Sequence, residues 1–243
     1  CAWCSRKSIF HEHSKPMPAT IFPLDREHRL AVFASILTVL LIMTACGSPE
    51  KKADDADDDL ASTDVYSLEV KKDRLEKDKY LMTSPNSPIK ASDMEFFSGL
   101  AYFEVDRKYV FHTALRPLAE PEEVIIATSK DRPRQMLHIG ELPFTYDNAE
   151  FAVQVYAPKD TSDGNYWFIP FTDNTSGVES YVGGRYIDID DVAADSVFLD
   201  FNYAYSPYCA YNERYDCPIP PPENALPITI AAGEKTYPLY HGK

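Results

Sequence analysis

Three polar side chains in the last third of the chain have the types and spacing of a binding or catalytic site. Asp200 and Asn202 are two residues apart, so on a strand they would share one face. Asp200 stands between two large apolar residues, where a carboxylate is costly unless it is paired. Arg185 is the natural partner, because its planar guanidinium can hold a carboxylate through two hydrogen bonds. We therefore expect an Arg185–Asp200 pair that either braces the loops or anchors a substrate.

Further acidic and aromatic residues stand close to this pair in the sequence. Glu179, Asp200 and Glu234 are the carboxylates that can act as a general acid or base. We expect an aromatic-lined pocket near Tyr181, Tyr186, Tyr205 and Tyr208, with Arg185 and Asn202 orienting a small polar or anionic ligand. The candidate ligand-binding residues are Arg185, Asp200, Asn202, Glu179, Tyr181, Tyr205, Asn224 and Glu234.

No recognised catalytic motif accompanies these residues. The sequence contains no G-x-S-x-G, H-E-x-x-H or calcium-loop pattern. Asp188, Asp190 and Asp191 fit a solvated strand face better than a Ca²⁺ site. The sequence therefore predicts no specific catalytic residue, metal site or cofactor.

Cys209 and Cys217 are separated by seven residues and followed at once by Pro218. In an exported protein, two nearby cysteines are most simply a disulfide. A thiolate metal site is the first alternative, and it would need two more ligands. A catalytic cysteine is the second, although no base stands beside either residue.

Gly177, Gly183 and Gly184 gather just before Arg185. Neighbouring glycines allow a positive φ or a close approach of the backbone to a ligand. The spacing fits neither a dinucleotide-binding fingerprint nor a phosphate loop. A tight turn between strands is the simpler interpretation.

The elements that must position these residues are mainly strands. Short runs rich in β-branched and aromatic residues are separated by Pro, Gly, Asp or Asn. Such spacing favours a single antiparallel β-sandwich or barrel-like domain. A helix over residues 64–80 precedes it and ends before a turn with two prolines. The expected strands are residues 100–105, 108–115, 122–129, 135–142, 150–156, 166–171, 185–190, 196–202 and 226–231.

Three stretches carry a resemblance to a known family. FFSGLAYFEVDRKYVFHTAL, FIPFTDNTSGVESYVGGRYID and LDFNYAYSPYCAYNERYDCPIPPPENALPITIAAGEK are similar to domain-of-unknown-function family 1684 of bacteria and archaea. The likeness runs from about residue 66 to the end of the chain. It implies no activity. The positions that match are Glu179, Tyr181, Gly184, Arg185, Asp200, Asn202, Tyr205, Cys209, Cys217, Pro218, Asn224 and Glu234.

The N-terminal region reads as an export signal. Residues 30–43 form an apolar run that is short for a membrane span and suits a signal-peptide core. Met43-Thr44-Ala45-Cys46-Gly47 then resembles a lipobox, which implies cleavage before Cys46 and a lipid on its thiol. An uncleaved anchor or an ordinary signal is the alternative. Residues 1–16 precede Met17, so we interpret 1–45 as a signal peptide with an upstream read-through start.

The segment 46–62 is strongly acidic, and we expect it to be a linker between the lipid and a domain over residues 63–243. The formal net charge of −14 excludes nucleic acid as a partner, because phosphate binding needs a basic stripe. The short run Lys71-Lys72-Arg74 is interrupted by an acid. The expected location is the cell envelope, on the outer membrane if the host is Gram-negative.

Two classes of function fit these features. The first is a lipid-anchored module that binds a small ligand and catalyses nothing. The alternative is a cell-envelope hydrolase or isomerase that uses carboxylates as acid and base, with or without a metal.

Overall fold

The computed structural model describes residues 55–160, 165–190 and 196–240, with side chains from residue 65 onward. Two units divide the chain, Cys1–Asp57 and Asp58–Lys243, and the fold below is that of the second unit. The predicted signal peptide and Cys46 lie outside the described residues. Within the described part, no helix is long and apolar enough to cross a membrane.

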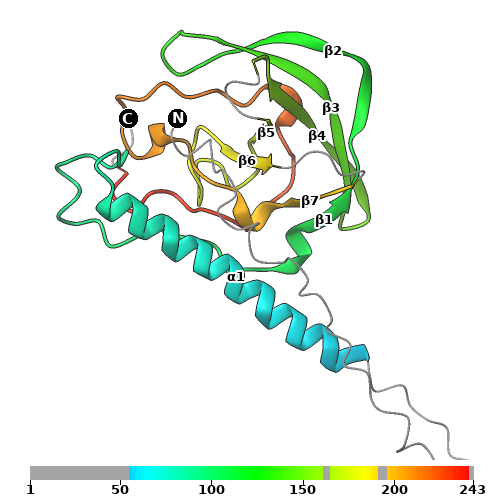
Figure 1. The fold of residues 1–243 in the computed structure, drawn as a ribbon, viewed down its shortest axis with the longest axis horizontal. Helices are drawn as coiled ribbons and strands as arrows, with labels where there is room; N and C mark the ends of the chain where they lie inside the picture. Colours follow the sequence, from blue (N-terminus) through cyan, green and yellow to red (C-terminus); the bar gives the residue numbers. More distant parts are fainter. Residues whose placement is uncertain (1–54, 161–164, 191–195, 241–243) are drawn as a thin grey trace, which may run out of the picture. The chain divides into compact units, whose positions relative to one another are not determined.

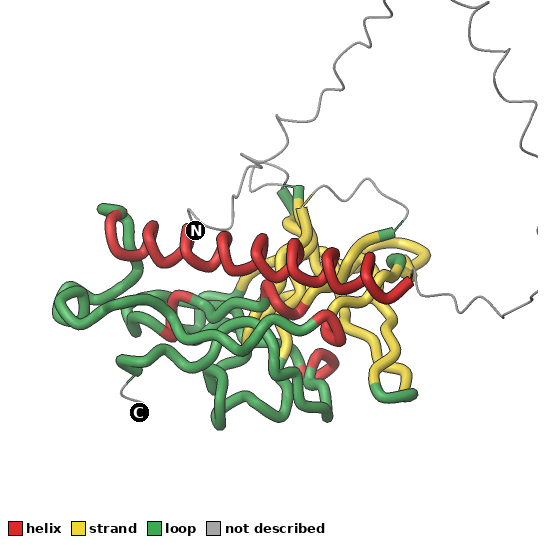
Figure 2. Tube along the Cα trace, turned by 90° about the horizontal axis from the view of Figure 1, so that it is seen from below, coloured by secondary structure: helices red, strands yellow, loops and turns green. Residues whose placement is uncertain are grey.

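Helix α1 (Asp55–Thr83) lies along one side of the strands and loops (Figures 1 and 2). It contains the expected helix 64–80 and begins earlier, inside the segment expected to be a linker. Acidic residues are favoured near a helix N-terminus because of its partial positive charge, so an acidic composition does not by itself distinguish a linker from the start of a helix. Val70, Lys77 and Leu81 form its buried side.

The larger sheet has five antiparallel strands in the order β2-β3-β4-β5-β6. A two-residue turn joins β3 to β4, and its residues Asp147 and Asn148 have positive φ. This turn lets the hairpin continue well beyond the predicted end at residue 142. The bounds are β2 (Arg116–Ile126), β3 (Arg134–Tyr146), β4 (Ala149–Pro158), β5 (Tyr166–Phe171) and β6 (Arg185–Asp190).

The smaller sheet pairs β1 (Val110–Thr113) with β7 (Val197–Asp200). The main core lies between this pair and one face of the larger sheet, where every second residue of β4 and β5 points inward. Val153, Ile169 and Leu199 are fully buried there. The expected mainly β, antiparallel fold with a helix before it is confirmed, and the larger sheet is open.

Two of the expected strands are wrong. Residues 100–105 make one isolated bridge, between Tyr102 and Glu234. Residues 226–231 form no strand, because their backbone groups bond to loops: the Leu226 amide donates to the Thr172 carbonyl at 2.8 Å. Both segments are extended and apolar, so in the sequence they look like strands.

The chain after β7 has little regular structure, and its last part, drawn in red in Figure 1, runs close to α1. It contains three short 3-10 helices, η4 (Phe201–Tyr203), η5 (Tyr208–Ala210) and η6 (Pro222–Asn224). A second apolar cluster joins it to the end of α1 through Leu81, Tyr211 and Tyr237. These loops carry four of the eight candidate ligand-binding residues, namely Asn202, Tyr205, Asn224 and Glu234.

Candidate functional site

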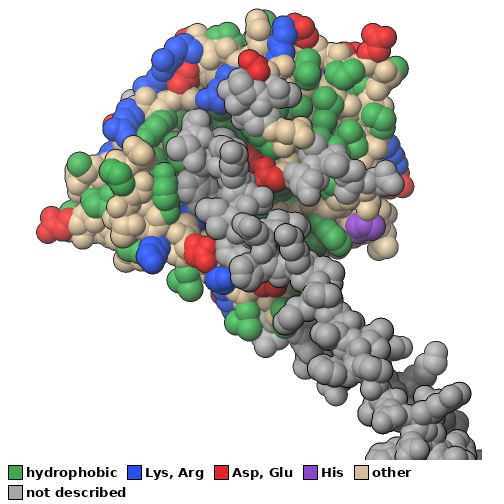
Figure 3. Space-filling model, viewed as in Figure 1, with side chains coloured by type: hydrophobic (Ala, Val, Ile, Leu, Met, Phe, Trp, Pro, Cys, Tyr) green, Lys and Arg blue, Asp and Glu red, His purple; other side chains and the backbone are tan. Residues whose placement is uncertain are grey.

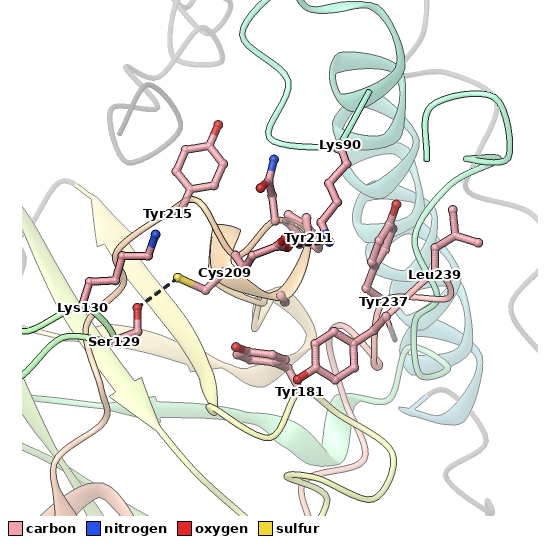
Figure 4. Close-up of a pocket in the computed structure, with 13 residues that line it drawn as sticks. Lys90, Ser129, Lys130, Tyr181, Cys209, Tyr211, Tyr215, Tyr237 and Leu239 are labelled. Atoms are coloured by element: carbon pink, nitrogen blue, oxygen red, sulfur yellow. Dashed lines mark hydrogen bonds and ion pairs between the residues drawn. The ribbon is translucent and has the colours of Figure 1, made fainter. Parts of the chain in front are cut away.

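A cavity of about 440 Å³ opens beside η5. Five tyrosines from three separate segments line it: Tyr181, Tyr211, Tyr215, Tyr237 and Tyr240. Figure 4 shows Tyr181, Tyr237 and Leu239 on one side of the cavity and Ser129, Lys130 and Cys209 on the other. The tyrosine pocket, as we call this cavity, contains one of the predicted ligand-binding residues, Tyr181.

The Cys209–Cys217 disulfide holds one wall of the tyrosine pocket. The two Cα atoms are 6.2 Å apart, and the loop that they close carries Tyr211 and Tyr215. The predicted disulfide is therefore confirmed. Its sulfurs carry no thiolate, which removes the metal-site and nucleophile alternatives for these two residues in this state.

The tyrosine rings pack edge to face. Tyr181 meets Tyr240 with ring centroids 5.5 Å apart, and Tyr211 meets Tyr237 at the same distance. Burial raises the pKa of Tyr181, and it raises the pKa of Tyr237 to about 12. The hydroxyl groups of Tyr181 and Tyr237 are therefore neutral at physiological pH, so they can donate and accept hydrogen bonds but bring no charge.

Two lysines give the rim of the pocket positive charge. The Lys90 ammonium lies 2.5 Å from the Glu213 carboxylate, a partner that neutralises it. The Lys130 ammonium donates to the Arg214 carbonyl at 3.0 Å. A carbonyl does not neutralise the charge of Lys130, and the ammonium has further N–H groups for an anionic ligand.

Glu234 lies beneath the pocket, only 2% exposed. Its Oε1 pairs with the ammonium of Lys77, which is also buried. Its Oε2 accepts from the Tyr211 hydroxyl at 2.6 Å and from the Ser206 amide at 2.8 Å. Glu234 therefore does not face the cavity itself, and it reaches the pocket through the wall residue Tyr211.

Asp188 and Tyr205 form a second polar site on the other side of Lys77. The Tyr205 hydroxyl donates to Oδ2 of Asp188 at 2.6 Å, and the Lys77 ammonium lies 5.1 Å from the centre of the Tyr205 ring. Oδ1 of Asp188 is buried and has no hydrogen-bond partner among the described residues. Burial raises the pKa of Asp188 to about 7, although the Tyr205 hydrogen bond opposes the shift.

Arg185 is fully buried, and its partner is Asp173 rather than Asp200. The guanidinium lies 3.1 Å from Oδ1 of Asp173 and also donates to the Ile230 and Ala232 carbonyls. The predicted Arg185–Asp200 pair is wrong, because the turn after β5 places Asp173 at the end of the Arg185 side chain. This arrangement is an internal brace between that turn and the C-terminal segment.

Asp200 and Asn202 form a separate brace. Oδ2 of Asp200 accepts from the Tyr66 hydroxyl of α1 at 2.6 Å, and its Oδ1 accepts from the Asn202 side chain at 3.0 Å. Asn202 also bonds both backbone groups of Asp106. The two residues are close together as expected, and they hold α1 and the segment before η2 (Arg107–Tyr109) against the end of β7.

The two remaining candidates lie apart from the pocket lining. Asn224 is fully buried, accepts from the Gln154 amide at 2.6 Å and donates to the Pro170 carbonyl at 2.8 Å, so it joins β4 to β5. Glu179 is exposed, and its carbonyl accepts from the Thr236 amide. Of the eight candidates, Tyr181 alone lines a described cavity.

The glycines before β6 behave as expected. Gly177 and Gly184 both have positive φ. At Gly184 a Cβ atom would lie 2.5 Å from the Phe171 carbonyl oxygen, so no larger residue fits. The turn therefore brings Tyr181 to the pocket and Arg185 into the core.

A second described cavity, of about 660 Å³, lies at β1, β3 and β4. Its lining includes Phe111, Phe144 and Phe151, with His112 and Arg116 at polar positions. None of the eight candidates lines it. Across the described residues, no three His, Cys, Asp or Glu side chains gather as a metal site would require.

Comparison with known proteins agrees with the resemblance seen in the sequence. Residues 95–235 match the profile of a family described as "Protein of unknown function (DUF1684)". An uncharacterized protein of Haloarcula marismortui, solved by solution NMR, is 35% identical, with a TM-score of 0.56. The match covers 72% of this chain and 97% of that chain. No curated protein matches the chain.

Proposed function

The chain belongs to the DUF1684 family, and since that family has no stated activity, we propose from the residues of this chain that it is a small-ligand-binding module. The observation that carries the proposal is the tyrosine pocket. Its volume of about 440 Å³ is in the range of sites for small molecules. The proposed ligand has a flat ring system and an anionic group.

The pocket lining supports both parts of that ligand. The faces and edges of Tyr181, Tyr215 and Tyr240 offer apolar surface for a ring, and aromatic pairs of this kind stabilise a complex beyond simple area burial. Lys130 supplies a positive charge, since its ammonium bonds to the Arg214 carbonyl and not to a carboxylate. The disulfide and the Tyr211–Glu234 hydrogen bond fix one wall before the ligand arrives, which lowers the entropic cost of binding.

We propose further that a lipid on Cys46 anchors this module in the cell envelope. The apolar run 30–43 and the Met43-Thr44-Ala45-Cys46-Gly47 sequence support this part. Metabolic labelling with radioactive fatty acid tests it: the label should be lost in Cys46→Ala. Unchanged labelling in that variant would contradict the anchor.

Fluorescence titration with 1-anilinonaphthalene-8-sulfonate, a ringed anion, tests the pocket. Tyr181→Ala and Lys130→Gln should each weaken binding about tenfold, as expected for one lost aromatic or charged contact. Arg116→Gln is the matched control, since it removes a cation from the other cavity. Equal affinities for Lys130→Gln and wild type, with a loss in Arg116→Gln, would refute the assignment of the site.

An acid–base enzyme is the second candidate, and Asp188 is the observation that favours it. A carboxyl with a pKa of about 7 is suited to proton transfer at neutral pH. Nitrophenyl esters and glycosides offered to the wild-type protein and to Asp188→Asn test this alternative. Turnover that Asp188→Asn abolishes would support it, and wild-type protein that turns over none of these substrates would count against it.

A further inference from the structure

The solvent-facing side of α1 carries a row of apolar side chains. Leu68, Leu75 and Met82 are 58%, 68% and 44% exposed. They are seven residues apart, and seven residues make almost two full helical turns, so the three side chains lie one above another. The opposite side of α1 packs into the domain through Val70 and Leu81, which are fully buried.

Lysines flank this row on both sides. At 100° per residue, Lys71 lies on one side of the row and Lys72 and Lys79 lie on the other. All three lysines are exposed. Figure 3 shows apolar, basic and acidic side chains next to one another along the edge where α1 runs.

This face differs in charge from the rest of the chain. The exposed residues of α1 between positions 65 and 83 include three lysines and two glutamates, whereas the whole chain has a formal charge of −14. Charges more than about 8 Å apart are largely screened at physiological salt. Within that distance the exposed lysines of this stretch outnumber the exposed glutamates by three to two, and one of the lysines, Lys72, pairs with Glu76 at 3.9 Å.

We propose that this face of α1 docks on an anionic lipid bilayer. Leu68, Leu75 and Met82 enter the boundary between headgroups and acyl chains, while the flanking lysines extend to the phosphates. Apolar side chains that enter the bilayer boundary, with lysines beside them, are found on helices that lie in the plane of a membrane surface.

The position of Cys46 in the sequence supports a bilayer as the partner. Eight residues lie between Cys46 and Asp55, where α1 begins, so the two are at most about 30 Å apart along the chain. This step rests on the lipid anchor of the proposed function. A second copy of the chain fits less well, because the lysines beside the row would face one another in a symmetric pair.

Depth-dependent quenching tests the docking on the acylated protein. A fluorophore on Glu76→Cys, next to the row, is compared with one on Ile125→Cys in β2, which is 72% exposed. Both proteins are placed in phosphatidylethanolamine–phosphatidylglycerol vesicles that contain a spin-labelled lipid. We expect strong quenching at position 76 and little at position 125. Equal quenching at the two positions, or none at position 76, would overturn the proposal.

An unacylated variant separates the docking face from the anchor. Cys46→Ser should still bind these anionic vesicles, less at high salt, and Lys72→Gln with Lys79→Gln should lower its binding about tenfold or more. If Cys46 carries no lipid, this vesicle-binding experiment alone tests whether α1 docks on the bilayer. If only the acylated protein binds the vesicles and position 76 is not quenched, the lipid anchor is supported and the docking of α1 is refuted. If the protein forms a dimer without lipid, and the double variant Leu68→Glu and Leu75→Glu is monomeric, this face binds a second copy of the chain instead.

Discussion

Asp188 should make the stability of this protein depend on pH near neutrality. Burial raises the pKa of this carboxyl from 3.8 to about 7, so between these values the folded protein holds a proton that the unfolded chain has released. Stability falls with rising pH wherever the folded state binds more protons. The contribution of Asp188 to the free energy of unfolding is complete below pH 4, declines as the pH rises towards 7, and is lost above pH 7.

The size of the effect follows from the width of that window. About three pKa units at roughly 1.4 kcal/mol each give an upper bound near 4 kcal/mol. Asp188 as a whole keeps some exposure, so we expect about half of this bound. Between pH 5 and pH 7 the loss should be about 1–2 kcal/mol.

Urea unfolding at several pH values, in wild type and in Asp188→Asn, measures this contribution. The amide keeps an oxygen for the Tyr205 hydroxyl but cannot titrate, so the difference between the two profiles isolates Asp188. Asp147→Asn is the control, because Asp147 is an exposed carboxylate in the β3–β4 turn, where asparagine also tolerates the positive φ. Parallel profiles for wild type and Asp188→Asn would refute the reasoning.

Three further predictions concern the parts that position the pocket. Arg185→Met should lower the free energy of unfolding in urea by about 3–5 kcal/mol, because it leaves Asp173 as an uncompensated buried charge. The control Arg132→Met removes a side chain that is 71% exposed and should cost less than about 1 kcal/mol. Similar losses for both variants would contradict the Arg185–Asp173 brace. The double variant Cys209→Ser and Cys217→Ser should lower the free energy of unfolding by roughly 2.5 kcal/mol in the same assay. Two free thiols in unreduced wild-type protein would exclude the Cys209–Cys217 disulfide. Gly184→Ala should lower the melting temperature more than Gly183→Ala. The new Cβ atom at Gly184, where φ is 84°, would clash with the Phe171 carbonyl at a cost of about 2 kcal/mol, whereas at Gly183 it would meet the movable ring of Tyr181. A larger loss in Gly183→Ala would contradict this reasoning.

The strands that pair in hairpins could be predicted from the sequence, and the extended loops could not be distinguished from them. Alternation over residues 150–156 and the turn residues Asp147 and Asn148 are local signals. Residues 226–231 carry the same composition, but their backbone bonds to the turn after β5, which lies more than fifty residues away in the sequence. Local pattern contains no information about such a partner.

The candidate site was predicted in part. Tyr181 and the disulfide were found because aromatic residues and paired cysteines are visible as types. Arg185 and Asp200 were recognised correctly as buried charges, but the choice between Asp173 and Asp200 as partner depends on how the turn after β5 folds. Lys77 was missed because one lysine in a charged helix carries no mark of burial. The C-terminal wall of the pocket, Tyr237 and Tyr240, was missed because its distance from Tyr181 is set only by the tertiary fold.

The assignment of the tyrosine pocket as the ligand site is tested most directly by NMR. Amide shifts of ¹⁵N-labelled protein are followed while 1-anilinonaphthalene-8-sulfonate is added, in wild type and in Tyr181→Ala. The account predicts saturable shifts centred on Tyr181, residues 209–215 and residues 237–240, and their loss in Tyr181→Ala. Shifts centred instead on Phe111, Phe144 and Phe151 around the other cavity, or no saturable shifts at all, would contradict it.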